Sequence, residues 1–265
     1  LGLPGAYAKA GMAGGTTLLV VVATLSLLGV HLLTEAADRV GRPASFYSVA
    51  QAAAGPKAGA LIDALVALNA FGVSTSYLIV VGDAIPEVAA SMNAPAALAN
   101  HRTLWIGIML AVAGPLAFLR SLSALRFTAY LAFVCVLYIS LLVGLYAIAP
   151  VTPYKHDFEP CANATATSCR GAVEMITGVT TVLDAMPIFI FAFTCHQNAI
   201  SITNELARPT SRRAFTAAAG AIVLALALYL LVGIGGYMTY GELAKPDILE
   251  SYPEHALMPL IGRLA

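Results

Sequence analysis

The chain has 265 residues, of which 59% are hydrophobic and 11% are charged, and its mean hydropathy is +0.83. This composition excludes an ordinary water-soluble domain and indicates an integral membrane protein. The 14 Lys and Arg residues balance the 14 Asp and Glu residues, which gives no support to nucleic-acid binding, because that function needs a basic surface. Long apolar stretches, without the short alternating segments of a membrane barrel, predict an all-α polytopic membrane protein.

The apolar stretches divide the chain into successive membrane spans. A partial span precedes six stretches that are each near the length a helix needs to cross a bilayer. In chain order the expected spans cover 1–10 (partial), 14–34, 61–82, 104–119, 128–149, 173–206 and 215–238. The chain begins inside one span, and its last residues, MPLIGRLA, are typical of the entry to another. We therefore expect one membrane domain over 1–265, truncated at both ends.

The span at 173–206 is expected to be broken. An unbroken helix over 171–206 would be roughly 54 Å long, against a hydrocarbon core of about 30 Å. Pro187 interrupts this stretch, and the run FAFTCHQN at 191–198 places five polar or polarisable residues at membrane depth, namely Thr194, Cys195, His196, Gln197 and Asn198. Polar groups are tolerated there only where they line a protein-buried or water-filled cavity. The run therefore predicts a transport site.

A second interrupted segment opens the chain as LGLPGAYAKAG, with Gly2 and Pro4 near its start. Transporters often build a midplane site from two discontinuous helices at corresponding positions of inverted repeats, and four complete spans separate these two segments. Freed N–H groups at such breaks attract a carboxylate, and freed carbonyls attract an ammonium group or a cation. The alternatives are a simple proline kink in the first segment and hydrogen bonding between helices in the second.

Other polar residues in the spans leave several interpretations open. His196 could bind substrate, titrate in a proton-coupled cycle, or stay neutral and hydrogen-bonded. Asn69, Ser74 and Tyr77 give the span at 61–82 a polar flank, which is either a site wall or a set of contacts between helices. The sequence shows neither a metal-spaced His/Glu pair nor a nucleophile with a base within helical reach, so we expect no metal site and no enzyme.

The charges of the loops predict an orientation. Lys and Arg are more frequent in the connections at 35–60, 120–127 and 207–214 than in the loops between them. By the positive-inside rule these three connections are cytoplasmic, and so is the N-terminus.

The loop at 150–172 is expected to be extracellular or lumenal. It contains Cys161, Cys169 and an acceptor sequon that begins at Asn163, all of which suit an oxidising, glycosylating compartment. A Cys161–Cys169 disulfide and a glycan on Asn163 are therefore hypotheses. The alternatives are free thiols or pairing with another segment, since spacing does not fix connectivity.

Four motifs, in their order and spacing, resemble the amino acid/auxin permease family, which includes the sodium-coupled neutral amino acid transporters and the vesicular GABA transporter. The motifs are LGLPGAYAKAG at 1–11, VSTSYLIVVGDAIPE at 73–87, FAFTCHQNAISITNEL at 191–206 and GGYMTYG at 235–241. The Gly-x-Gly-Ile that usually precedes the first motif is absent.

The resemblance implies a leucine-transporter-like bundle of inverted repeats, of which this chain holds about the first seven of eleven helices. It also implies secondary active transport of amino acids by symport or exchange, with Na⁺ or H⁺ as the coupling ion and no other cofactor. The substrate would lie between the broken first and sixth helices, next to Gly2, Leu3, Pro4, Phe193, Thr194, Cys195 and His196.

The expected substrates are neutral amino acids, because His196 is the sole strongly ionisable group at the predicted site. An amino acid-binding membrane sensor without net transport is the alternative. A seven-helix receptor is more remote, because the start of the chain is predicted to be cytoplasmic and a receptor needs no broken sixth span. Plasma, vacuolar, lysosomal and vesicular membranes all fit, and the oligomeric state is not predicted.

Overall fold

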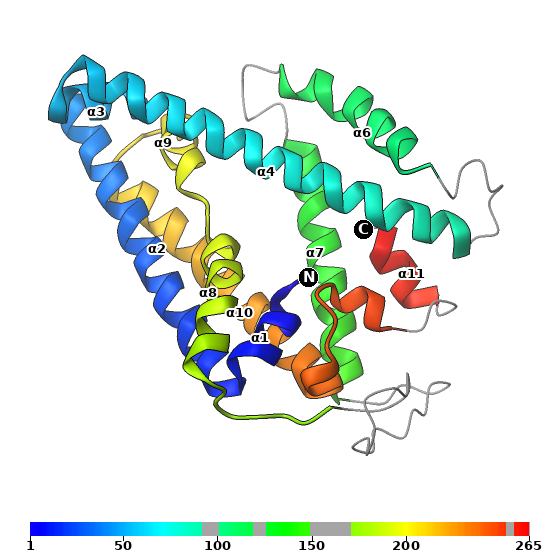
Figure 1. The fold of residues 1–265 in the computed structure, drawn as a ribbon. Helices are drawn as coiled ribbons and strands as arrows, with labels where there is room; N and C mark the ends of the chain where they lie inside the picture. The colour runs from blue at the N-terminus through cyan, green and yellow to red at the C-terminus, as the bar shows by residue number, and fades with distance from the viewer. Residues whose placement is uncertain (92–100, 119–125, 149–170, 253–256, 265) are drawn as a thin grey trace.

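The computed structural model describes residues 1–91, 101–118, 126–148, 171–252 and 257–264 (Figure 1). All regular secondary structure in these ranges is helical. The α-helices are α1 (Leu3–Ala10), α2 (Met12–Val40), α3 (Phe46–Ala54), α4 (Pro56–Ser91), α6 (Arg102–Ala117), α7 (Arg126–Ile148), α8 (Val179–Ala192), α9 (His196–Asn204), α10 (Ser211–Tyr240) and α11 (Leu257–Leu264), with 3₁₀ turns η2 (Gly241–Leu243) and η3 (Ile248–Ser251).

Five of the described helical segments are long and apolar enough to cross a membrane. They are Met12–Val40, Pro56–Pro86, Arg126–Ile148, Val179–Asn204 and Ser211–Leu243. Helix α6 is apolar but has 16 residues, or about 24 Å at 1.5 Å per residue, so it is shorter than the hydrocarbon core. The expected all-α polytopic fold class is confirmed.

Helix α1 folds back on α2 through a single residue, Gly11. Its φ of +74° lies in the left-handed region, and a Cβ added there would lie 2.8 Å from the carbonyl oxygen of Met175. Only glycine avoids both the strain and the clash. Beyond the turn, the N–H of Met12 donates to the carbonyl of Glu174, which ties the α1–α2 corner to the segment before α8.

The core lies where α1 packs between α2, α8 and α10. The ring of Tyr7 is fully buried, and it lies edge-on to Phe189 of α8 with a centroid distance of 5.7 Å. A Cβ added at Gly15 of α2 or at Gly233 of α10 would approach this ring to 2.8 Å or 2.5 Å. Small residues at helix contacts in membranes allow this close approach, so the two glycines are what admit Tyr7 between α2 and α10.

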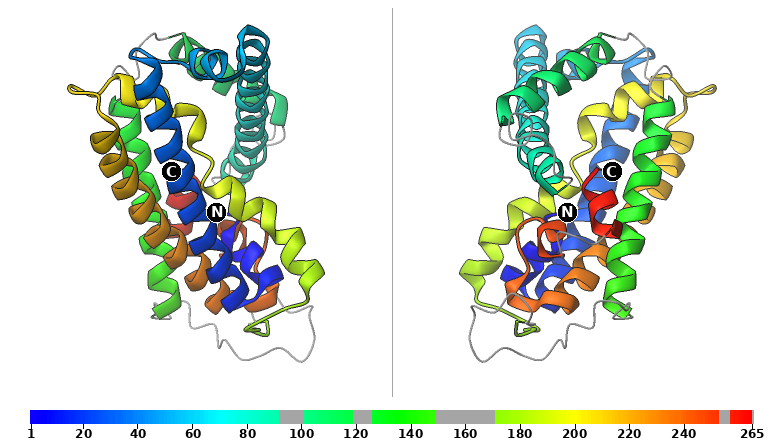
Figure 2. Two further views of the ribbon diagram at one scale, coloured as in Figure 1. Left: turned by 90° about the vertical axis from the view of Figure 1, so that its left-hand side faces the viewer. Right: turned by 90° about the vertical axis from the view of Figure 1, so that its right-hand side faces the viewer.

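Helix α4 lies apart from this core. With α3 and α6 it forms an arm that leaves the α2–α8–α10 layer, as the two side views show (Figure 2). None of the apolar window of α4 is buried, and Leu61, Leu68 and Phe71 are exposed along it. Apolar side chains exposed on a membrane-spanning helix are typical of a surface that contacts lipid or other helices.

The interruption of the 173–206 stretch lies at Phe193–Cys195, between α8 and α9. Pro187 does not cause it, because this proline lies inside α8 and the helix continues past it. The break is supported by hydroxyl groups of neighbouring helices. Tyr229 of α10 donates to the carbonyl of Ala192 at 3.0 Å, and buried Ser26 of α2 donates to the carbonyl of Phe193 at 3.0 Å. These bonds satisfy carbonyls that a continuous helix would have paired internally.

Candidate functional site: the α8–α9 break and its cavity

The break exposes the N-terminal end of α9. The N–H groups of His196 and Gln197 have no hydrogen-bond acceptor within the described part of the chain, and the N-cap residue Cys195 makes no side-chain cap. Free N–H groups at a helix start carry a partial positive charge, which favours an anionic group such as a carboxylate.

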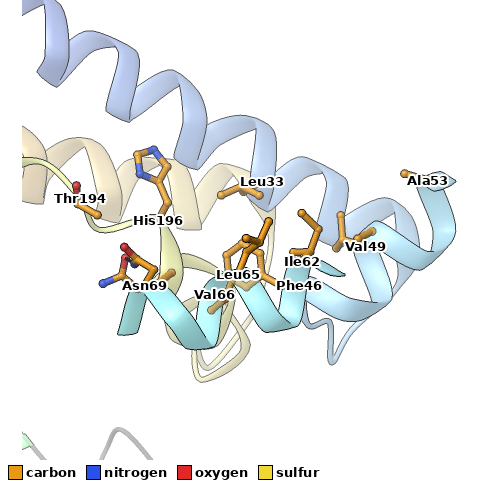
Figure 3. Close-up of a pocket in the computed structure, with 12 residues that line it drawn as sticks. Leu33, Phe46, Val49, Ala53, Ile62, Leu65, Val66, Asn69, Thr194 and His196 are labelled. Atoms are coloured by element: carbon orange, nitrogen blue, oxygen red, sulfur yellow. Dashed lines mark hydrogen bonds between the residues drawn. The ribbon is translucent and has the colours of Figure 1, made fainter. Parts of the chain in front are cut away.

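A cavity of about 480 Å³ lies next to this end of α9 (Figure 3). It is open on one side, and residues of α2, α3, α4, the α8–α9 break and the start of α9 line it. The residues that line it are Leu33, Phe46, Val49, Ala50, Ala53, Ile62, Leu65, Val66, Asn69, Thr194, His196 and Gln197. Its polar residues gather at the end beside the break and its apolar residues at the other end, and no Asp, Glu, Lys or Arg is among these twelve. A volume of this order suits a small organic molecule.

The polar end holds several groups that a ligand could contact. Asn69 of α4 donates from Nδ2 to Oε1 of Gln197 at 3.2 Å, which links α4 to the start of α9. The Thr194 hydroxyl donates to the carbonyl of Ile190 at 3.1 Å and can still accept a hydrogen bond. The His196 ring makes no hydrogen bond to any residue that the structure describes. Its Nε2 lies against Gly29 of α2, where an added Cβ would be 2.6 Å away.

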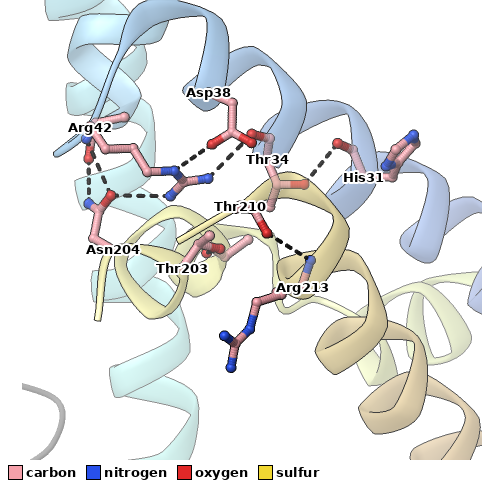
Figure 4. Close-up of polar contacts among 10 residues, drawn as sticks. His31, Thr34, Asp38, Arg42, Thr203, Asn204, Thr210 and Arg213 are labelled. Atoms are coloured by element: carbon pink, nitrogen blue, oxygen red, sulfur yellow. Dashed lines mark hydrogen bonds and ion pairs between the residues drawn. The ribbon is translucent and has the colours of Figure 1, made fainter. Parts of the chain in front are cut away.

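The other end of α9 is fixed by a polar cluster around Asn204 (Figure 4). The Asn204 amide pairs with the backbone of Ala44, accepting its N–H at 3.3 Å and donating to its carbonyl at 2.7 Å. Arg42 donates to Oδ1 of Asn204 at 3.3 Å and to Asp38 at 2.5 Å, and its side chain is 11% exposed. Thus α9, whose start borders the cavity, is joined at its end to the connection between α2 and α3.

Three of the predicted site residues meet at the cavity, namely Thr194, His196 and Asn69. Gln197, which belongs to the predicted polar run, also lines the polar end. The apolar residues of α2, α3 and α4 that complete the cavity were not singled out by the sequence. The sequence could have indicated the α4 residues of the lining, because positions 62, 65, 66 and 69 are spaced by three or four residues and so lie on one face of a helix.

The predicted residues of the first segment lie elsewhere. Leu3 is buried in the same hydrophobic cluster as Phe193, and Pro4 lies against α10, where a Cβ added at Gly236 would be 2.5 Å from its Cγ. Gly2 lies near Pro246 and Ile188. None of Gly2, Leu3, Pro4 or Phe193 is among the residues that line the cavity, although Phe193 is the direct neighbour of Thr194 in the chain.

The remaining candidates also lie outside the cavity lining. Cys195 is exposed, with its Sγ 3.8 Å from the Ser26 hydroxyl. Ser74 and Tyr77 are exposed farther along α4. The predicted disulfide Cys161–Cys169 and the sequon at Asn163 fall outside the described residues.

These features define an all-helical, multi-pass membrane protein with a broken helix bordering a largely apolar cavity. A family model described as "Transmembrane amino acid transporter protein" matches residues 1–265, so the chain belongs to that family, as its four motifs predict. The chain is 32% identical over its whole length to "Vacuolar amino acid transporter 5" of Schizosaccharomyces pombe, covering 60% of that protein. It is 30% identical over its whole length to "Vacuolar amino acid transporter 6" of Saccharomyces cerevisiae, covering 57% of it.

A relative from animals is also found. Over 99% of the chain, identity to human "Sodium-coupled neutral amino acid transporter 7" is 26%, covering 55% of that protein. The chain thus spans somewhat more than half the length of these curated relatives, which are named as transporters and not as enzymes. No solved structure matches the chain.

Proposed function

We propose that this chain carries the substrate-holding part of a secondary amino acid transporter, which moves neutral amino acids across a membrane by ion-coupled symport or exchange. The observation that carries the proposal is the α8–α9 break, after which the N–H groups of His196 and Gln197 have no acceptor among the described residues, while both residues line a cavity without charged lining residues. Membership of the transporter family supports it.

The two charged groups of a free amino acid suit the two kinds of polar group at the break. The carboxylate would accept hydrogen bonds from the N–H groups of His196 and Gln197, where the start of α9 favours negative charge. The ammonium group would donate to the side-chain oxygen of Asn69 or to the hydroxyl of Thr194, which lie at the same end of the cavity. A charged substrate side chain would lack a counter-charge in the cavity, which disfavours it.

The proposed orientation places this cavity toward the cytoplasm. The end of α2, the connection to α3 and the end of α9 meet in the Asn204 cluster, and the basic residues assigned to the cytoplasm lie in the adjoining connections. The cavity borders α3 and the second half of α2, so it lies in the same half of the molecule. This proposal makes the loop at 150–172 lumenal or extracellular, and Asn163→Gln would then shift the gel mobility of the glycosylated protein.

Uptake of labelled amino acids by the full-length protein in proteoliposomes tests the proposal, with sodium and proton gradients imposed separately. Thr194→Val removes the hydroxyl that would accept from the ammonium group and is expected to raise the KM of uptake by about 10-fold or more, since a hydrogen bond to a charged group contributes about 1.5–3 kcal/mol. His196→Ala keeps the backbone N–H and removes the ring at the polar end of the cavity, so it tests whether the ring itself contributes to substrate binding. Thr24→Val is the matched control, because Thr24 of α2 makes the same hydroxyl-to-carbonyl bond one helical turn back, at 2.8 Å, on an exposed face.

Each outcome of this experiment decides something. Unchanged uptake by both site variants would remove the site assignment. Binding of an amino acid without accumulation under either gradient would favour the sensor over the transporter. Accumulation that depends on one gradient would identify the coupling ion.

A further inference from the structure

We propose that the apolar end of the cavity is a side-chain subsite that selects amino acids with large aliphatic or aromatic side chains. The residues that form it are Leu33, Phe46, Val49, Ile62, Leu65 and Val66. This inference rests on the proposed function, because it assumes that the backbone of an amino acid binds at the polar end.

The subsite is continuous with the polar end and is built from three helices. Leu33 comes from α2, Phe46 and Val49 from α3, and the other residues from α4 (Figure 3). In that view the apolar side chains lie between α2 and α4, directly beyond Asn69 and His196. A ligand held by its charged groups at the break would therefore have to direct its side chain toward this apolar surface, or leave that surface uncovered.

The stripe on α4 sets the depth of the subsite. Ile62, Leu65, Val66 and Asn69 lie at spacings of three and four, so they share one face of the helix. Asn69 is the one polar member, and Ile62 lies two turns away, about 10 Å along the axis at 1.5 Å per residue. This length accommodates a leucine, phenylalanine or tryptophan side chain, whereas the side chain of alanine would leave most of the stripe uncovered.

The chemistry of the lining sets the direction of selectivity. Burial of apolar surface favours large apolar side chains, and each methylene placed in a hydrophobic pocket changes specificity by about 10-fold or more. Acidic and basic side chains would be desolvated without a partner, because no lining residue carries an opposite charge. The expected order of preference is therefore leucine and phenylalanine, then alanine and glycine, then glutamate and lysine.

The experiment measures a ratio, so that it separates the subsite from folding and from transport itself. Uptake of leucine, phenylalanine, alanine, glycine, glutamate and lysine is measured with the full-length protein in proteoliposomes. For the wild type we expect the KM for leucine to be about 10-fold or more below that for alanine. Leu65→Ala should reduce the ratio of the alanine KM to the leucine KM by about 5- to 10-fold. Val66→Phe should raise the KM for leucine while alanine uptake is retained.

Leu68→Ala is the matched control. Leu68 is the same residue type, lies three positions from Leu65 on α4 and is outside the cavity, with an exposed fraction of 66% against 51% for Leu65. This control variant should keep the wild-type ratio of KM values.

Three results would overturn the inference. They are a wild-type KM for glycine or alanine at or below that for leucine, an unchanged ratio in both Leu65→Ala and Val66→Phe, and an equal change in Leu68→Ala. The KM values of the wild type for the six amino acids test the inference even where a variant fails to fold. In all three cases the proposed function stands, because an amino acid is still transported. Absence of uptake for the whole panel, by contrast, would contradict the proposed function itself.

Discussion

Replacement of Gly29 by alanine tests whether the position of His196 matters for transport. The alanine Cβ would lie 2.6 Å from Nε2 and 3.0 Å from Cδ2 of His196, whereas ordinary contacts are 3.4–4 Å. The imidazole must therefore retreat by about 1 Å from α2. Because His196 is the first residue of α9 and lines the cavity, this displacement changes the polar end directly.

Two effects of the substitution act in opposite directions. Alanine in place of glycine inside a helix stabilises the fold by up to about 1 kcal/mol, and the clash offsets part of this gain because it involves a side chain that can turn. Transport should nevertheless fall, since a misplacement of about 1 Å at a reacting or binding group can cost about 100-fold. We expect a loss of about 10- to 100-fold in the ratio of maximal uptake rate to KM, with little or no loss of thermal stability.

The assay is uptake by the full-length protein in proteoliposomes, together with a thermal-unfolding midpoint in detergent. Gly220→Ala in α10 is the control, because a Cβ there meets nothing within 4 Å. A double-variant cycle isolates the cause. If Gly29→Ala acts by displacing the ring, combining it with His196→Ala should do no more harm than His196→Ala alone. Normal uptake by Gly29→Ala, or strict additivity in the cycle, would refute the reasoning.

Two further predictions concern the contacts that hold the site in place. Asn204→Ala leaves the backbone of the α2–α3 connection without its amide partner and should lower the thermal-unfolding midpoint by roughly 2–12 °C. Asn198→Ala, at an exposed position of α9, is the control and should leave the midpoint unchanged. Equal midpoints for the two variants would contradict this assignment. Gly233→Ala places a Cβ 2.5 Å from the Tyr7 ring and should destabilise the protein by about 1–3 kcal/mol. The destabilised variant should yield less monodisperse protein in size-exclusion chromatography. An elution profile like that of Gly220→Ala would show that the core accommodates the added methyl group.

The sequence by itself determined the class of protein and most of its helices. Apolar runs of membrane-spanning length must become helices, because each backbone group needs an internal partner in lipid. Accordingly α2, α4 and α10 cover the stretches 14–34, 61–82 and 215–238, and α7 covers the described part, 128–148, of the fourth stretch. The polar run FAFTCHQN also indicated where a helix could break, since such groups are costly in a regular lipid-facing helix.

The tertiary structure decided which residues meet at the site. Pro187 was the obvious local candidate for the break, yet α8 continues past it. The break lies several residues later, where the hydroxyls of Ser26 and Tyr229 donate to the carbonyls of Phe193 and Ala192. The pairs Asn69–Gln197 and Ala44–Asn204 join residues 128 and 160 positions apart. Helix formation depends on neighbours within a few residues, whereas these contacts depend on how whole helices pack. The LGLPG segment packs into the core with α8 and α10, and its part in substrate binding stays a prediction.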